Sequence, residues 1–573
     1  MLAAPQTKGF GPAHDGVRVV SPGHLVLVLH THLPWVLGHG RWPHGQDWLH
    51  EAIAECYVPL LRMIDRMVED GVSPQLTIGI TPVLAEMLAS PRLREDFAEY
   101  CEERTWRAEE DRKEFRRFHA GEISTLAAHW SEFYEFALDD FRRTYKSDIL
   151  GALRRLQDEG HIEILTSAAT HGYLPLLGTQ ANVSAQVRAG VATYRRHFGR
   201  APKGIWLPEC AYRPGGAWTG SGGRREGARP GLERVLAANG LAFFFVDTHL
   251  VAGGTPMGTY EDRIAGDMVA KRRKPTGQSP NEPHAVIAKG GKRLAVYARD
   301  PRSSTQVWSA DYGFPGDGAY LEFHRKKGPQ GLRYHRVTDR RTPLDAKEVY
   351  APEAAAKRAA VHAEHFIGLV RGTLAAFHRE HGRPGVVVAP FDTELFGHWW
   401  FEGPQWLEHV LRGLQEDVTP LTASAVLERH PPASAIRLPE GSWGLGGAHH
   451  VWNNDDTAWV WDLVYRAEDA FLQFVNAAKG KRRPELKRVA AQLARELLIL
   501  ESSDWPFLIT TRSARDYAEA RVKLHADAFD ELLAVGKRVL EASLTKADEA
   551  LLRELEMRDA PFPEIDLGWW TGD

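Results

Sequence analysis

Two carboxylate residues each follow a short, apolar, β-rich run of the sequence. Glu209 lies in the segment WLPECAY, and Asp392 lies in APFDTELFGHWWFEG. A pair of carboxylic acids flanking one bond is the usual machinery of glycoside cleavage, because one attacks the anomeric carbon or activates water while the other protonates the departing oxygen. Four aromatic residues that suit the flat faces of sugars lie nearby in the sequence: Trp206, Tyr212, Trp399 and Trp400. The alternative interpretation is a pair of strand-end carboxylates in structural ion pairs.

The segment His30-Thr31-His32 places two imidazoles on one face of an extended chain, because the side chains of a strand alternate between its faces. Together with Asp247, these histidines could bind a metal ion, hydrogen-bond sugar hydroxyls or tune a carboxylate. An H-x-H pattern alone is weakly specific, and we predict a site without a metal. Other polar residues also stand directly after apolar runs: His171, His249, Arg299 and Glu394.

Seven near-continuous apolar runs must position these residues. They cover residues 25–30, 76–80, 162–166, 204–207, 242–247, 294–298 and 385–389. Such runs are typical of parallel strands buried on both faces, and helical patterns lie between several of them, at 48–70 and 351–381 for example. We therefore predict an α/β fold, an incomplete TIM-like (β/α)7 barrel with its polar residues at the carboxyl ends of the strands. A doubly wound open sheet is the alternative.

The remaining segments divide the chain. Residues 1–20 form a lead-in, residues 21–435 the barrel with inserted loops around 213–235 and 250–292, and residues 436–573 a C-terminal helical domain that contributes to the substrate groove. We expect a Gly- and Arg-rich loop at 216–230 and a polar, mobile insertion at 262–292. Helical periodicity recurs in the last part of the chain, at 457–476, 484–502, 514–535 and 545–557.

Composition excludes several classes of protein. The 75 acidic and 71 basic side chains give a net charge of −4, which argues against a nucleic-acid partner. No run approaches the ~18 apolar residues of a membrane span, and the first residues lack the apolar core of a signal peptide. Three widely spaced cysteines, without a CxxC pair, fit neither a disulfide scaffold nor a cysteine zinc module. We expect a cytoplasmic protein, a monomer or a weak homo-oligomer.

The 18 tryptophans are the outlier of the composition. Several stand in Gly-rich or polar segments, where we expect platforms for sugar stacking: Trp308, Trp443, Trp452 and Trp505. Trp459 and Trp461 lie in a predicted C-terminal helix, where we expect core packing.

Seven segments, in order along about residues 24–530, resemble the motifs of glycoside hydrolase family 57, specifically of its 1,4-α-glucan branching enzymes. They are LHTHLP (29–34), THGYLPLL (170–177), WLPECAY (206–212), VWSADYGFPGD (307–317), FDTELFGHWWFEG (391–403), EGSWGLGG (440–447) and SSDWPFL (502–508). The resemblance implies a (β/α)7 barrel with an inserted subdomain and a C-terminal helical domain. The segments near 220 and at 262–292 are longer than a minimal family member needs.

The resemblance also implies roles for single residues. Glu209 becomes the nucleophile, Asp392 rather than Glu394 the acid/base, and Tyr260 a loop residue over the site. No cofactor and no metal are implied. Together with the patterns above, the resemblance assigns substrate contacts to ten residues: His30, His32, His171, Arg299, Trp308, Gly316, Trp399, Trp443, Trp452 and Asp504.

The predicted function is therefore a retaining transfer of an α-1,4-glucan chain to a 6-hydroxyl, which makes an α-1,6 branch, as in glycogen. A 4-α-glucanotransferase or an α-amylase-type hydrolase on the same scaffold is the nearest alternative. A metal-dependent polysaccharide deacetylase, suggested by the His and Asp residues, and a noncatalytic glycan-binding protein are alternatives of other classes.

Overall fold

A computed structural model describes residues 23–118, 121–257, 272–309, 312–415, 418–481 and 483–571. Seven parallel strands form its centre: β1 (Gly23–Thr31), β2 (Leu76–Ile80), β3 (Ile162–Leu165), β4 (Gly204–Ile205), β7 (Phe243–Val246), β9 (Arg293–Ala298) and β10 (Gly385–Asp392). Each coincides with one of the predicted apolar runs. Strands β1 and β2 are buried at every position, as expected of parallel strands covered on both faces.

The strands follow the order β10-β1-β2-β3 in one sheet and β4-β7-β9 in the other. A parallel bridge between Thr166 and Ile205 joins β3 to β4. On the far side, the N–H of Asp300 donates to the carbonyl of Val388 at 2.8 Å, which links the end of β9 to β10. The incomplete (β/α)7 barrel is confirmed, and the open sheet is not what the chain adopts.

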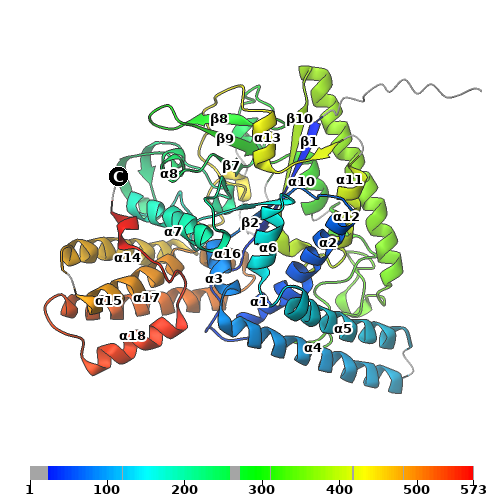
Figure 1. The fold of residues 1–573 in the computed structure, drawn as a ribbon, viewed down its shortest axis with the longest axis horizontal. Helices are drawn as coiled ribbons and strands as arrows, with labels where there is room; N and C mark the ends of the chain where they lie inside the picture. The colour runs from blue at the N-terminus through cyan, green and yellow to red at the C-terminus, as the bar shows by residue number, and fades with distance from the viewer. Residues whose placement is uncertain are drawn as a thin grey trace, which may run out of the picture.

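Helices cover the barrel on its outside (Figure 1). They are α1 (Gln46–Ala52), α2 (Val58–Glu69), α3 (Pro82–Leu88), α4 (Pro91–Arg117), α5 (Gly121–Asp139), α6 (Ile149–Asp158), α7 (Gln180–Phe198), α8 (Leu232–Ala238), α9 (Thr248–Val251), α10 (Pro301–Trp308), α11 (Pro352–His381), α12 (Gly403–Gly413) and α13 (Ala423–Arg429). Between α1 and α2 the chain makes a π-helical turn, η1 (Ile53–Tyr57). The helix predicted at 48–70 is thus three elements in one continuous stretch.

The C-terminal helices lie together at the lower left of Figure 1. They are α14 (Ala458–Ala478), α15 (Pro484–Leu500), α16 (Asp504–Thr511), α17 (Arg515–Val539) and α18 (Lys546–Arg558). Four of them match the predicted helices. The short helix α16 was not expected, because its sequence DWPFLITT shows too few turns for a helical period.

Two segments differ from the expectation of loops. Residues 216–230 form a hairpin of β5 (Gly216–Thr219) and β6 (Arg225–Arg229), in which the Arg229 guanidinium lies 3.7 Å from the ring centroid of the buried Trp218. Within 262–292, β8 (His284–Ile287) pairs antiparallel with β9. Packing on Trp218 orders the first segment, and pairing with β9 orders residues 284–287 of the second. The polar composition of the two segments reveals neither partner. The last strand, β11 (Thr419–Pro420), pairs with β1.

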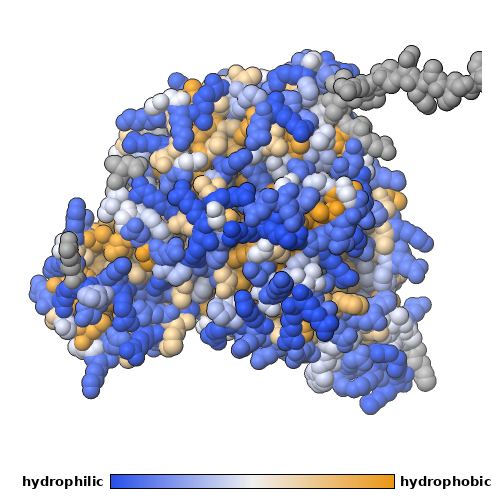
Figure 2. All heavy atoms as spheres, viewed as in Figure 1, coloured by the Kyte–Doolittle hydropathy of each residue, from blue (hydrophilic) through white to orange (hydrophobic). Residues whose placement is uncertain are grey.

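The face of the molecule in Figure 2 is largely hydrophilic, with small hydrophobic areas between the charged side chains. Among the described residues, every helix is too short or too polar to cross a membrane.

Candidate active site

Glu209 stands just after β4 in a short 3-10 turn, η3 (Pro208–Cys210). Its backbone has φ 60° and ψ 26°, and that of Cys210 has φ 49°. Left-handed backbone is costly for residues other than glycine, by about 1–3 kcal/mol, and is kept where the surroundings hold it. The turn directs the Glu209 side chain towards the C-terminal segment instead of along the barrel wall.

That segment holds the Glu209 carboxylate. The indole Nε1–H of Trp443 donates to Oε2 at 2.7 Å, and the backbone N–H of Trp443 donates to the Glu209 carbonyl at 3.2 Å. Nδ1 of His171 lies 3.9 Å from the other carboxylate oxygen. Burial raises the pKa of Glu209 to about 8, although the Trp443 hydrogen bond lowers it, and the charge of Asp392 raises it further.

Asp392 ends β10, directly opposite His30 of β1 in the strand register. Burial raises its pKa to about 7, against the lowering effect of the His32 and Arg299 charges. Its carboxylate has no hydrogen bond from the residues that the structure describes. The two carboxyls therefore interact electrostatically, and like charges on them oppose each other.

Three histidines from β1 and from the loop after β3 form a stacked group. His30 and His171 share a hydrogen bond between their Nε2 atoms at 3.1 Å, and the rings of His32 and His171 lie 4.0 Å apart. His30 also stacks on Trp206 at 4.8 Å. Burial holds the pKa values of His30 and His171 well below their usual range, so both rings are neutral at pH 7.

The C-terminal helical region holds this histidine group by hydrogen bonds. His32 Nε2 lies 2.9 Å from Asp504 Oδ2, at the start of α16, and Nδ1 of His171 lies 2.8 Å from the Ser503 hydroxyl. Although burial opposes ionisation of Asp504, the charge of His32 and the hydrogen bond from its ring keep the Asp504 pKa below its usual range. Barrel and C-terminal residues thus build one polar site together.

Arg299, after β9, is buried beside Asp247, after β7. Its Nε–H donates to Asp247 Oδ1 at 2.9 Å, and the guanidinium lies 5.6 Å from the centroid of the Trp443 ring. Burial opposes ionisation of Asp247, but Arg299 and His249 hold its pKa well below its usual range. Arg299 Nη2 has no hydrogen-bond partner among the described residues, which leaves one buried donor for a ligand or a water.

The family model described as glycosyl hydrolase family 57 matches residues 26–439, which is most of the chain. The chain belongs to glycosyl hydrolase family 57. A second model, described as the C-terminal part of 1,4-alpha-glucan branching enzyme, matches residues 463–570. The two matches cover the barrel and the C-terminal helices.

Relatives in family 57 match nearly the whole chain. A 1,4-alpha-glucan branching enzyme of Thermococcus kodakarensis is 44% identical over 96% of this chain and 79% of its own length. The crystal structure of that enzyme matches with a TM-score of 0.88, over 96% of this chain and 97% of that chain. The crystal structure of a branching enzyme from Pyrococcus horikoshii, 40% identical, matches with a TM-score of 0.87 over the same shares of the two chains. An alpha-amylase from Thermotoga maritima is 31% identical, with a TM-score of 0.78, over 96% of this chain and 99% of that one.

Within this family 57 site, six of the predicted residues gather around the carboxylate pair of Glu209 and Asp392. They are His30, His32, His171, Arg299, Trp443 and Asp504. Trp308 is half-buried at the end of α10, with its ring 6.4 Å from that of Phe391, the residue before Asp392. Gly316 instead lines a surface groove of about 400 Å³ with Phe314 and Asp317, and none of the residues named above lines that groove. Tyr260 lies outside the described residues.

The division of the tryptophans between exposed and core positions differs from the prediction. Trp399 is 41% exposed, whereas Trp400 is packed in the core. Trp452 has no exposed surface and stacks on Tyr173 at 4.5 Å, and Trp505 is equally buried. Trp452 and Trp505 therefore offer no surface to a sugar. Trp452 lies in a turn that packs on Tyr173, and Trp505 lies on the buried side of α16, against Tyr517 of α17. Trp461 is core, as predicted, while Trp459 is half-buried.

The candidate metal ligands in the structure differ from those that the sequence suggested. Asp247 is bonded to Arg299 and His249, so it does not join His30 and His32 as the sequence suggested. Instead, ligand atoms of His32, His171 and Asp504 all lie within 4.8 Å of one another. Hydrogen bonds already use these atoms, because Asp504 accepts from His32 and from the Ser502 hydroxyl.

Sequence reasoning missed Ser503, whose hydroxyl bonds His171 and whose N–H donates to the His171 carbonyl at 3.2 Å. The motif SSDWPFL contains two adjacent serines, and nothing in the sequence distinguishes Ser503 from Ser502.

Proposed function

We propose that the chain is a 1,4-α-glucan branching enzyme, a transferase that acts on α-1,4-glucan. The observation that carries this proposal is the near-complete match to branching enzymes. The region matched to the branching-enzyme C-terminal model, residues 463–570, supplies Asp504 to the site, where it bonds His32. We also propose a domain boundary at residue 436, which the end of the family 57 match at residue 439 supports.

The proposed reaction is a retaining double displacement. Glu209 attacks the anomeric carbon of an internal α-1,4-linked glucose while Asp392 protonates the departing 4-oxygen, which leaves a glycosyl ester on Glu209. Asp392, now a carboxylate, then takes the proton of a 6-hydroxyl on another glucan as that oxygen displaces Glu209. The product is an α-1,6 branch on a chain that keeps its anomeric configuration.

The electrostatics of the pair fit these roles. The Trp443 and Ser503 hydrogen bonds favour an ionised Glu209, while Asp392 has no such donors and is free to exchange a proton. The pKa of Glu209, about 8, lies above that of Asp392, about 7, so when the pair holds one proton the proton favours Glu209 and the productive form is the minor one. Positive charge that develops at the anomeric carbon stabilises the Glu209 carboxylate in the transition state. This stabilisation offsets the preference of the proton for Glu209 over Asp392.

Transfer must compete with water for the glycosyl ester. We assign to Tyr260 the role of closing the site over the intermediate, on the resemblance of its segment to the family loop. A closed loop that excludes water favours the sugar acceptor over hydrolysis.

Substrate binding falls to the residues around the pair. Among the residues that the structure describes, Nη2 of Arg299 and Nδ1 of His30 are unpaired polar atoms that can bond sugar hydroxyls. We propose that His32 and His171 contact the sugar through their rings, because protein partners already bond their nitrogens. Trp443 borders the anomeric position, Trp399 offers an exposed ring, and Trp308 and Gly316 extend the site outwards. We propose no metal and no cofactor. Trp452 supports the site from beneath, through Tyr173.

We further propose a cytoplasmic protein, active as a monomer or a weak homo-oligomer, with a place in glycogen synthesis. All three cysteines are buried free thiols, which suits a reducing compartment. A nucleic acid or a membrane is not a proposed partner, in line with the net charge of −4. Size-exclusion chromatography with light scattering tests the oligomeric state.

The function is tested on amylose by the chain-length profile before and after treatment with a debranching enzyme. A branching enzyme yields short chains that appear only after debranching. Chains that shorten without debranching, with new reducing ends, would instead identify an α-amylase-type hydrolase, and redistributed linear chains would identify a 4-α-glucanotransferase. Acetate release from an acetylated polysaccharide that stops on addition of a chelator would identify the deacetylase.

A further inference from the structure

The short segment after Asp392 is held by three consecutive residues of the π-helical turn η1. This segment begins with the 3-10 turn η7 (Thr393–Leu395) and continues to His398. Because Asp392 is the residue that precedes η7, the path of the segment sets the direction of the Asp392 side chain.

Each of the three residues makes one polar contact. The Tyr57 hydroxyl donates to Glu394 Oε1 at 2.6 Å, the Cys56 thiol donates to the Thr393 carbonyl at 2.9 Å, and Glu55 Oε2 lies 2.8 Å from His398 Nδ1. Both sides of these contacts are buried or nearly so. Burial and the charge of Asp392 raise the pKa of Glu394 to about 8, although hydrogen bonds from the Tyr57 hydroxyl and from backbone groups lower it.

The three contacts come from neighbouring residues of a π turn and are spread along the segment, at Thr393, Glu394 and His398. In an α-helix successive side chains point about 100° apart, so three in a row do not share a face. Here the N–H of Val58 bonds the carbonyl of Ile53 five residues earlier, and this wider turn rotates the chain less per residue. π turns of this kind are frequent at functional sites.

The backbones of turn and segment also touch. Gly397 has φ 107°, and a Cβ atom at this position would lie 1.9 Å from the Glu55 carbonyl oxygen. Any side chain here would force the segment away from the π turn. A glycine is required, and the sequence has one in FGHWW.

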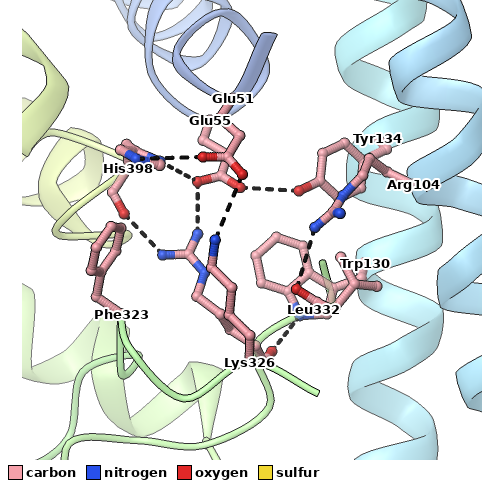
Figure 3. Close-up of a pocket in the computed structure, with 11 residues that line it drawn as sticks. Glu51, Glu55, Arg104, Trp130, Tyr134, Phe323, Lys326, Leu332 and His398 are labelled. Carbon is pink, nitrogen blue, oxygen red and sulfur yellow. Dashed lines mark hydrogen bonds and ion pairs between the residues drawn. The ribbon is translucent and has the colours of Figure 1, made fainter. Parts of the chain in front are cut away.

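Glu55 is itself anchored from behind (Figure 3). Its Oε2 accepts from Arg333 Nη2 at 2.8 Å, its Oε1 accepts from the Tyr134 hydroxyl at 3.0 Å, and Arg333 also donates to the His398 carbonyl at 2.9 Å. Although burial opposes ionisation of Glu55, Arg333 and His398 lower its pKa to about 2. The π turn is thus fixed on a buried carboxylate that stays charged at neutral pH.

We propose that the π-helical turn Ile53–Tyr57 is the positioning element of the acid/base, with Glu55, Cys56 and Tyr57 as positioning residues that aim Asp392 by holding residues 393–398. This inference rests on the proposed function, in which Asp392 transfers the proton. The residues of the turn touch neither glucan nor Glu209 and act through the segment alone.

The test is the steady-state kinetics of full-length Tyr57→Phe on amylose. This change removes one hydroxyl and keeps the buried ring. The matched control is Tyr145→Phe, which removes a hydroxyl that donates to Asp65 at 3.1 Å, away from the site. Because misplacement by about 1 Å costs up to 100-fold in rate, we expect kcat of Tyr57→Phe to fall 10- to 100-fold with KM changed less than twofold. The control should keep the wild-type kcat, although both variants lose similar thermal stability.

Equal kcat values for Tyr57→Phe and its control overturn the proposal, as does a loss that appears only in KM. If Tyr57→Phe does not fold, Cys56→Ala answers the same question with a smaller change, and an unaltered kcat there counts against it. Asp392→Asn, assayed in parallel, separates the two proposals. Full activity of Asp392→Asn refutes the proposed role of Asp392, whereas an inactive Asp392→Asn beside a fully active Tyr57→Phe refutes the positioning role alone.

Discussion

Trp443 donates its indole N–H to the Glu209 carboxylate across 2.7 Å, and its backbone N–H donates to the carbonyl of the same residue. The two residues come from the C-terminal segment and from the end of a barrel strand. The contact therefore tunes the proposed nucleophile from outside the barrel.

Trp443→Phe should lower kcat/KM and move the alkaline limb of its pH profile upwards. A hydrogen bond to a charged group is worth about 1.5–3 kcal/mol, so its loss raises the pKa of Glu209 by about 1–2 units. Fewer molecules then carry an ionised Glu209 with a protonated Asp392, and the maximum of kcat/KM falls at least tenfold. Trp106→Phe, at a site that is 60% exposed on α4, is the control. An unshifted limb in Trp443→Phe would contradict the assigned hydrogen bond.

The wild-type profile of kcat/KM against pH should be a narrow bell. Below about pH 7 both carboxyls are protonated and no nucleophile exists, while above about pH 8 both are ionised and no acid remains. Rates measured from pH 5 to 10, with re-assay at pH 7.5 to exclude denaturation, check this. Activity that is constant from pH 5 to 9 would show that the two groups do not titrate as a pair.

Asp247→Asn should destabilise the protein by about 3–5 kcal/mol at pH 7, because it leaves the buried Arg299 charge without a counter-ion. The pKa of Asp247 is depressed in the folded state, so the stabilisation is present above about pH 4 and is lost as pH falls through the folded pKa. The difference between variant and wild type should therefore shrink in acid. Urea unfolding measures it.

The control for that experiment is Asp456→Asn, which breaks a half-exposed pair with Arg515 at 3.4 Å. Exposed pairs of this kind contribute little to stability, because water and salt screen the two charges. An Asp247→Asn variant no less stable than this control would mean that Arg299 is satisfied without Asp247.

Trp399→Ala should weaken the binding of long glucans. The ring is 41% exposed beside the segment of Asp392, and loss of a stacking contact of ~1 kcal/mol corresponds to about a fivefold rise in KM. Short maltooligosaccharides that do not reach Trp399 should show no change, and Trp106→Ala should affect neither. A fall in kcat at constant KM would place Trp399 in the chemistry instead.

Tyr260→Ala should shift products from α-1,6 branches towards hydrolysed reducing ends, because water then reaches the glycosyl ester. Reducing-end release and branch number, measured on the same amylose sample, give the ratio, with Tyr260→Phe as the variant that keeps the ring. If Tyr260→Ala leaves the ratio of branching to hydrolysis unchanged, Tyr260 does not protect the ester.

The barrel strands could be predicted from the sequence because strands buried on both faces are continuous apolar runs, as in β7 (FFFV). The motifs also located Glu209, Asp392 and the histidines, because a residue at the end of a strand lies wherever that strand ends in the barrel. The expectation for Trp452 and Trp505 was wrong, because polar neighbours such as Asn453 and Asp504 suggest an exposed position, whereas packing on Tyr173 and on α17 buries both rings. The π turn and Ser503 depend on partners more than 300 residues away in the chain, and no local pattern records them.

The site joins residues that lie far apart in the chain. His32 meets Asp504, and His171 meets Ser503, so the early histidines gain these partners only once the segment around residue 504 has been made. During synthesis, a chain that has completed its barrel therefore carries Glu209 and Asp392 before Trp443, Ser503 and Asp504 exist to orient the site. Barrel formation and assembly of the site are thus separate events in time.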